Sequence, residues 1–172
     1  MPKYAQEGSQ ISDGVNLLIS ILVRYPEVGA IDYNPETQSL KLTFMLSGIP
    51  TNQEYTSVRQ VIFDSIAAYH MLEDNHDTFS DISVSTCEHV AMLKIIRDVK
   101  TLSKGEIALI ITLLRDTFKN RLITDQNDSM QEEDLLVQEE LIEDMLESLK
   151  KSQAVHKLIG IREDGRVLVF NK

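Results

Sequence analysis

The chain has 172 residues, of which 42% are hydrophobic and 26% are charged. This composition is typical of a globular protein and argues against disorder, and the length suits one domain with a sizeable core. The longest apolar runs, 17–23 and 107–114, are far shorter than the roughly 20 residues of a transmembrane helix, so we expect no membrane span. A single cysteine, Cys87, and no secretory signal at the polar N-terminus favour a cytoplasmic protein.

The negative charge is concentrated in one segment. Of the 27 acidic residues, ten lie between Asp125 and Leu149, which contains no Lys or Arg; the 17 other acids balance the 17 bases, and the net charge is −10. A localised acidic surface attracts basic partners and repels phosphate backbones. We therefore expect a protein partner of basic character and no binding to nucleic acid.

The first part of the chain predicts a helix, a hairpin and a second helix. Residues 1–10 are polar and expected to be flexible. The first helix is predicted from Ser12 or Asp13 to about Tyr25, before the stop signal of Pro26. Period-two alternation over 28–46 predicts a β-hairpin, and a second amphipathic helix follows from about 51 to 72. The residues expected on the inner face of the first helix are Val15, Leu18, Ile19 and Leu22.

A further strand is predicted to begin near Phe79. Residues 86–98 are ambiguous, because Ser85 and Glu88 suit a capping box whereas the apolar run suits a continuing or second strand. We favour a strand, since the preceding elements leave a sheet that needs more members.

The helix predicted over 101–122 is the expected centre of the core. Ser103 and Glu106 form a capping-box pair at its start. Apolar residues cover so much of its circumference that the helix should be largely buried.

The last part of the chain predicts an acidic helix and a second hairpin. Residues 125–130 are expected to be a connector, and 131–151 a helix whose apolar stripe faces the core or a second copy of the chain. Asp164-Gly165 suits a two-residue type I′ turn in a hairpin over 157–170. That turn places Ile159 opposite Phe170, Ile161 opposite Leu168 and Glu163 opposite Arg166. The apolar stripe of the acidic helix consists of Leu135, Leu136, Leu141, Ile142, Met145, Leu146 and Leu149.

This order of elements predicts an α+β fold for residues 1–172, taken as one domain. We expect a two-layer sandwich with helices packed on one face of a mainly antiparallel sheet, to which the acidic helix and the C-terminal hairpin are added.

The first functional hypothesis is a non-enzymatic module that acts through protein contacts, as a homodimer. Its binding surface is expected on the acidic helix or at an open sheet edge. The alternative for the acidic helix is a solvated face whose charges pair with Arg115, Lys119 and Arg121 of the central helix. The predicted partner-binding residues are Glu139, Glu140, Glu143, Asp144 and Glu147.

The second hypothesis is a metal-dependent enzyme, such as a hydrolase. Its ligands would come from the segment HMLEDNHD, in which imidazole and carboxylate groups are close in sequence. The spacing matches no closed metal motif, so a solvated helix end is the simpler interpretation. The candidate metal ligands are His70, Asp74, His76 and Asp77.

Two further possibilities depend on groups of two or three residues. Cys87 and His89 would project to the same side of an extended strand, where a thiol and an imidazole can approach each other. A small-molecule sensor is the third functional hypothesis, with Tyr33, Tyr55 and Tyr69 as polar groups in a pocket between sheet and helices. No common nucleotide, redox, protease or hydrolase motif is present, so no cofactor is predicted.

Overall fold

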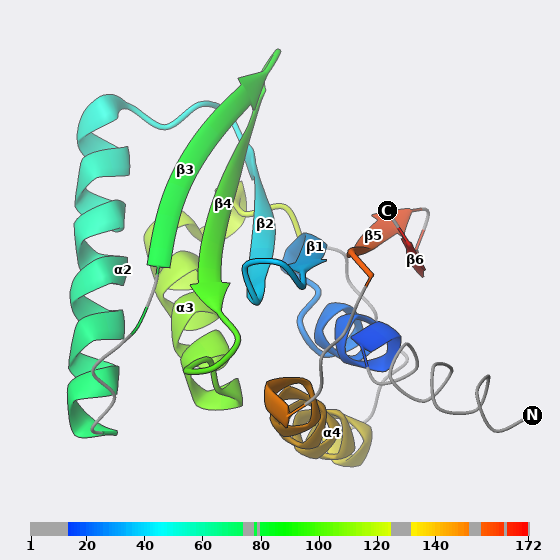
Figure 1. The fold of residues 1–172 in the computed structure, drawn as a ribbon. Helices are drawn as coiled ribbons and strands as arrows, with labels where there is room; N and C mark the ends of the chain where they lie inside the picture. Colours follow the sequence, from blue (N-terminus) through cyan, green and yellow to red (C-terminus); the bar gives the residue numbers. More distant parts are fainter. Residues whose placement is uncertain are drawn as a thin grey trace, which may run out of the picture.

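The computed structural model describes residues 14–73, 78, 80–124, 132–151, 156–163 and 165–171, with only the backbone for 132–135. Its strands form one antiparallel sheet in the order β3-β4-β2-β1-β5-β6, and helices pack on one side of this sheet (Figure 1). The predicted α+β fold is therefore confirmed. The expected flexible segment 1–10, the start of the first helix at Ser12 or Asp13 and the connector 125–130 lie outside the described residues.

The first hairpin supplies the middle of the sheet. An N-terminal helix over 14–24 precedes β1 (Val28–Asn34) and β2 (Ser39–Ser47). These two strands form the predicted hairpin, in which Ile31 lies opposite Leu42 and Tyr33 opposite Leu40. Alternate side chains of both strands face the helices and are buried, as period-two patterning requires. The inner face of the N-terminal helix is rotated slightly from the prediction and consists of Leu17, Leu18, Ile21 and Leu22.

The second hairpin extends the sheet on one side. Helix α2 (Asn52–Leu72) begins with a complete capping box between Thr51 and Glu54. It is followed by β3 (Ser80–Cys87) and β4 (Val90–Asp98), which confirms the strand favoured for 86–98. Because β4 pairs with β2, this hairpin and the first one share a single sheet.

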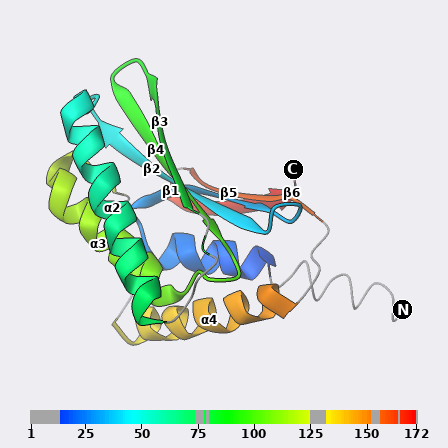
Figure 2. The same cartoon turned by 60° about the vertical axis from the view of Figure 1, so that its left-hand side comes forward.

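The remaining helices lie in two layers on the same side of the sheet. Helix α3 (Lys104–Phe118) is followed by the 3₁₀ helix η1 (Lys119–Arg121), and α4 (Glu132–Lys151) comes next in the chain. Figure 2 shows the N-terminal helix between the sheet and α4. None of the helices in the described part of the chain has the length and apolar character that a membrane crossing requires.

The C-terminal hairpin extends the sheet on the side opposite to β3. Strands β5 (Leu158–Glu163) and β6 (Arg166–Asn171) pair in the predicted register, and β5 pairs with β1. Gly160 lets the N-terminal helix pack closely on β5, since a Cβ atom there would lie 3.0 Å from Leu22 Cδ1. The Arg162 guanidinium also donates to the carbonyl oxygens of Leu22, Tyr25 and Val28, which fastens the hairpin to the end of the N-terminal helix.

Candidate functional site

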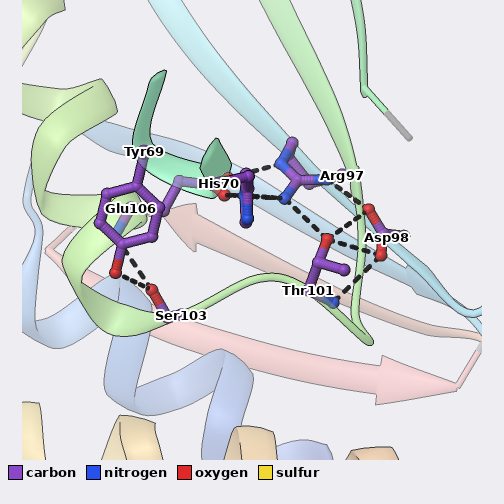
Figure 3. Close-up of polar contacts among 7 residues, drawn as sticks. All are labelled: Tyr69, His70, Arg97, Asp98, Thr101, Ser103 and Glu106. Carbon is purple, nitrogen blue, oxygen red and sulfur yellow. Dashed lines mark hydrogen bonds and ion pairs between the residues drawn. The ribbon is translucent and has the colours of Figure 1, made fainter. Parts of the chain in front are cut away.

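A buried group of polar side chains joins three elements of the fold. Figure 3 shows side chains from the end of α2, the end of β4 and the start of α3 meeting in one place. Glu106 is fully buried, Arg97 is 1% exposed and His70 is 2% exposed. We call this group the Arg97 cluster; its members are Tyr69, His70, Arg97, Asp98, Thr101, Ser103 and Glu106.

Arg97 and Glu106 form the centre of the Arg97 cluster. Arg97 Nη2 donates to Glu106 Oε1 at 2.7 Å, and Nε donates to the other carboxylate oxygen. This two-point pairing fixes both side chains and offsets part of the cost of burying their charges. Burial alone would lower the pKa of Arg97, but the bonds and charges of Glu106 and then Asp98 outweigh it and raise that pKa above its ordinary value. The guanidinium therefore stays charged.

The other members hold this ion pair in position. His70 Nε2 lies 2.8 Å from Arg97 Nη2 and also contacts Glu106 Oε1. Asp98 binds Arg97 Nη1 and accepts hydrogen bonds from the Thr101 amide and hydroxyl, which shapes the turn between β4 and α3. The elements that pack against one another are thus locked together by charge-assisted hydrogen bonds.

This geometry gives the Arg97 cluster a structural role. A catalytic acid or base must reach the proton that it transfers in a bound substrate, whereas His70, Arg97 and Glu106 are almost completely enclosed. Their polar atoms are also engaged with one another. The arrangement suits positioning of α2, β4 and α3 rather than contact with a ligand.

The sequence signals for the Arg97 cluster were present but incomplete. Arg97 occupies an inward position of β4, in the same alternating series as Leu93 and Ile95, and a charge there calls for a buried partner. His70 likewise continues the buried stripe of α2, four residues after Ile66. Glu106 was expected to close a capping box, but its backbone amide alone binds the Ser103 hydroxyl, and its carboxylate binds Arg97.

The candidate metal ligands are only partly described. His70 belongs to the Arg97 cluster, where the Arg97 guanidinium lies next to its Nε2 atom. Asp74, His76 and Asp77 lie outside the described residues. Within the described ranges, no group of three or more His, Cys, Asp or Glu side chains is placed to hold a metal ion.

The expected approach of Cys87 and His89 along one strand is wrong. Cys87 ends β3 and pairs with Val90, so Glu88 and His89 form the turn of a tight hairpin. Glu88 has a φ of 56°, a left-handed conformation that reverses the chain. Cys87 is exposed at this turn. Alternation along an extended segment therefore does not apply to this pair.

The three tyrosines have separate environments. Tyr55 donates to the Ile82 carbonyl oxygen at 3.0 Å, and the Tyr69 hydroxyl lies 2.6 Å from Ser103 Oγ. Tyr33 is buried, which raises the pKa of its phenol, and it lines a hollow of about 210 Å³ beside Asp32 and Lys41. These contacts do not bring the three hydroxyl groups together in one pocket.

The predicted partner-binding residues divide into two sets on α4. Glu139 forms an ion pair with Arg24 at 2.6 Å, and Glu143 accepts a hydrogen bond from the Lys104 amide at 3.2 Å. These two carboxylates bind α4 to its neighbours. Glu140, Asp144 and Glu147 are instead exposed. Among the described residues, Glu147 forms an ion pair with Lys150 of the same helix.

Apolar residues of α4 are divided in the same way. Ile142, Leu146 and Leu149 are buried in the core. Leu136 and Val137 are 58% and 54% exposed, and Leu141 is 36% exposed. The expected single stripe is therefore wrong for Leu136 and Leu141. We call the exposed side of this helix the α4 outer face; it consists of Leu136, Val137, Glu140, Leu141, Asp144 and Glu147.

Two of the three bases expected to pair with α4 have other partners. Arg115 binds the buried Glu27, and Arg121 binds Glu54 at 2.6 Å. The α4 outer face is therefore not neutralised by these two residues of α3 and η1.

Comparison of the chain with models of protein families, with curated proteins and with solved structures found no match. The function is therefore inferred from the geometry and charge of the described residues.

Proposed function

We propose that this protein is a non-enzymatic interaction module whose α4 outer face binds a basic, amphipathic segment of another protein. The observation that carries the proposal is the exposure of Leu136, Val137 and Leu141 beside Glu140 and Asp144, two exposed carboxylates with no ion pair to a described side chain. Neither solubility nor packing within the monomer accounts for that combination.

The inner side of α4 holds the helix against the rest of the protein. Ile142, Leu146 and Leu149 anchor it in the core, and the Arg24 to Glu139 ion pair fixes its flank. A binding surface on a rigid element loses little conformational freedom when a partner binds. A partner would therefore meet a preformed surface.

The apolar residues of the α4 outer face supply the short-range part of binding. Each gains about 25 cal/mol for every Å² that a partner covers. Side chains at positions 137, 141 and 144 lie near one another because residues three and four apart share a helix face. An opposing amphipathic helix can cover such a surface with its own apolar side.

The carboxylates set the charge of the partner. Glu140 and Asp144 form no ion pair with the side chains that the structure describes. A basic segment would therefore be attracted at long range and held in register by contacts at the rim. An acidic segment would be repelled.

A synthetic helical peptide with Leu on one side and Lys on the other is the probe. We expect it to bind the wild-type chain in a fluorescence titration, and we expect Glu140→Lys with Asp144→Lys to weaken binding at least tenfold. The variant with Glu36→Lys and Asp116→Lys is the matched control, because it changes the charge equally at two exposed sites elsewhere.

A second peptide separates specific docking from general attraction. In this peptide Ser replaces every Leu, so it retains the charge and loses the apolar side. We expect it to bind much more weakly, and we expect Leu141→Ser to weaken binding of the first peptide. Equal binding of both peptides, or equal losses in the α4 variant and its control, would rule out the proposed surface.

A further inference from the structure

Strand β6 ends the sheet and leaves one side of its backbone without a strand partner among the described residues. An edge of this kind presents free N–H and C=O groups that can pair with another strand. Its location is visible beside the C-terminal label in Figure 1.

The opposite edge of the sheet is protected. Helix α2 lies alongside β3 in Figure 1, and the Tyr55 hydroxyl of that helix donates to the Ile82 carbonyl oxygen. β3 also carries Asp81, a charged residue that discourages pairing with other strands.

The middle of β6 lacks these protective features. Residues 167–170 read Val-Leu-Val-Phe, with no Pro, no charge and no helix placed over the edge by the described contacts. Leu168 and Phe170 are 39% and 48% exposed on the side of the sheet away from the helices. This edge is therefore open both in its backbone and in its side chains.

The hairpin register determines which backbone groups are free. Glu163 pairs with Arg166 across a two-residue turn, and the pair that flanks such a turn exchanges both hydrogen bonds. Alternation then directs the backbone groups of Leu168 and Phe170 toward β5. Those of Val167, Val169 and Asn171 point away from it, toward the open side.

We propose that β6 pairs antiparallel with β6 of a second copy of this chain, about a two-fold axis at Leu168, so that one sheet continues through both copies. This register places Leu168 opposite Leu168 and Val167 opposite Val169. It also places Arg166 opposite Phe170, where a guanidinium can lie over an aromatic ring.

Self-complementarity is what favours a second copy over an unrelated strand. Every opposed pair shares a face of the sheet, as antiparallel pairing requires, and no like charges face each other. A register centred on Val169 would instead oppose Arg166 to Lys172. The strongly acidic α4 lies beyond the N-terminal helix, away from β6 (Figure 2), and this dimer does not depend on the proposed role of α4.

Engineered cysteines test the register. In a Cys87→Ser background, Leu168→Cys would place two thiols on directly opposed residues, whose Cα atoms are about 4.5 Å apart in a pair without hydrogen bonds. This distance suits a disulfide. We expect mild oxidation to give a covalent dimer with Leu168→Cys and little with Val169→Cys. Cross-linking at 169 in preference to 168 would overturn the register.

A proline tests the backbone pairing. Val169→Pro removes an outward N–H group and leaves the hydrogen bonds to β5 in place, whereas Val169→Ala removes similar packing and keeps the N–H group. We expect sedimentation equilibrium to show a dimer for the wild type and Val169→Ala, and a monomer for Val169→Pro. A monomeric wild type, or a dimer unchanged by the proline, would overturn the proposal.

Hydrogen exchange of the wild-type chain decides the question if Val169→Pro does not fold. The amides of Val167 and Val169 should become protected as protein concentration rises, while fast exchange at all concentrations would contradict the dimer. The α4 variant with Glu140→Lys and Asp144→Lys should still dimerise, so failure of one proposal is distinguishable from failure of the other.

Discussion

The Arg97 cluster and the α4 outer face contain similar charged side chains in opposite environments. In the Arg97 cluster, carboxylate, guanidinium and imidazole groups are enclosed and bonded to one another. On the α4 outer face, Glu140 and Asp144 are exposed, without ion pairs to described side chains. Burial makes the loss of one partner costly, whereas an exposed charge contributes little to stability and is available for binding.

The largest effect on stability is expected from Glu106→Gln. This change removes the fully buried counter-charge of Arg97 and leaves only the partly exposed Asp98 beside the guanidinium. Breaking a buried pair in this way costs about 3–5 kcal/mol. Urea unfolding followed by circular dichroism measures the loss.

An apolar replacement sharpens this first prediction. Changing His70→Leu, Arg97→Met and Glu106→Leu together removes the buried ion pair as a unit, and such replacements are often neutral in stability. Asp98 then loses Arg97, but its side chain is 16% exposed and still accepts hydrogen bonds from Thr101. The triple variant should therefore be more stable than Glu106→Gln alone. A Glu106→Gln protein as stable as the wild type would show that the ion pair contributes nothing.

An intermediate effect is expected from Arg115→Ala, because this pair combines the two environments. Arg115 is half exposed, but its partner Glu27 has a side-chain exposure of only 4%. Glu27 Oε1 already lacks a hydrogen bond among the described residues, so the variant leaves the whole carboxylate poorly satisfied. We expect a loss of about 1–3 kcal/mol by urea unfolding. Asp116→Ala, at the exposed neighbouring position, should have almost no effect.

A smaller, pH-dependent effect is expected at Glu54. The Thr51 amide first, and the Arg121 guanidinium second, lower the pKa of this carboxyl from its ordinary value of 4.5. Because the folded pKa is the lower one, the stabilisation is complete above the unfolded value and disappears as the pH falls through the folded value. The difference in unfolding midpoint between wild type and Glu54→Gln should therefore shrink on acidification below about pH 4.5. A difference independent of pH would contradict this linkage.

The parts of the fold that depend on local chemistry were predictable from the sequence. Asp164-Gly165 set the register of the last hairpin, and Ser103 marked the start of α3 because its hydroxyl caps the helix. Alternation over 28–46 gave the first hairpin. In each case, residues close in sequence carry the necessary information.

The features that depend on distant contacts were not predictable. Glu106 matched a capping box, but its carboxylate binds Arg97 instead, because the turn after β4 places the start of α3 against the end of that strand. The division of the α4 stripe into buried Ile142 and exposed Leu136 depends on how far α4 overlaps its neighbours. Likewise, the tight turn at Glu88 separated Cys87 from the alternating pattern assumed for it.

Stability and peptide binding, both measured in one α4 variant, test most directly whether the exposed carboxylates of the α4 outer face serve binding rather than folding. For Glu140→Lys with Asp144→Lys, we expect a urea unfolding curve within about 0.5 kcal/mol of the wild type, as for exposed sites in general, together with at least a tenfold loss of affinity for the Leu- and Lys-bearing peptide. A large loss of stability, or undiminished peptide binding, would contradict the assignment of these carboxylates to a binding surface.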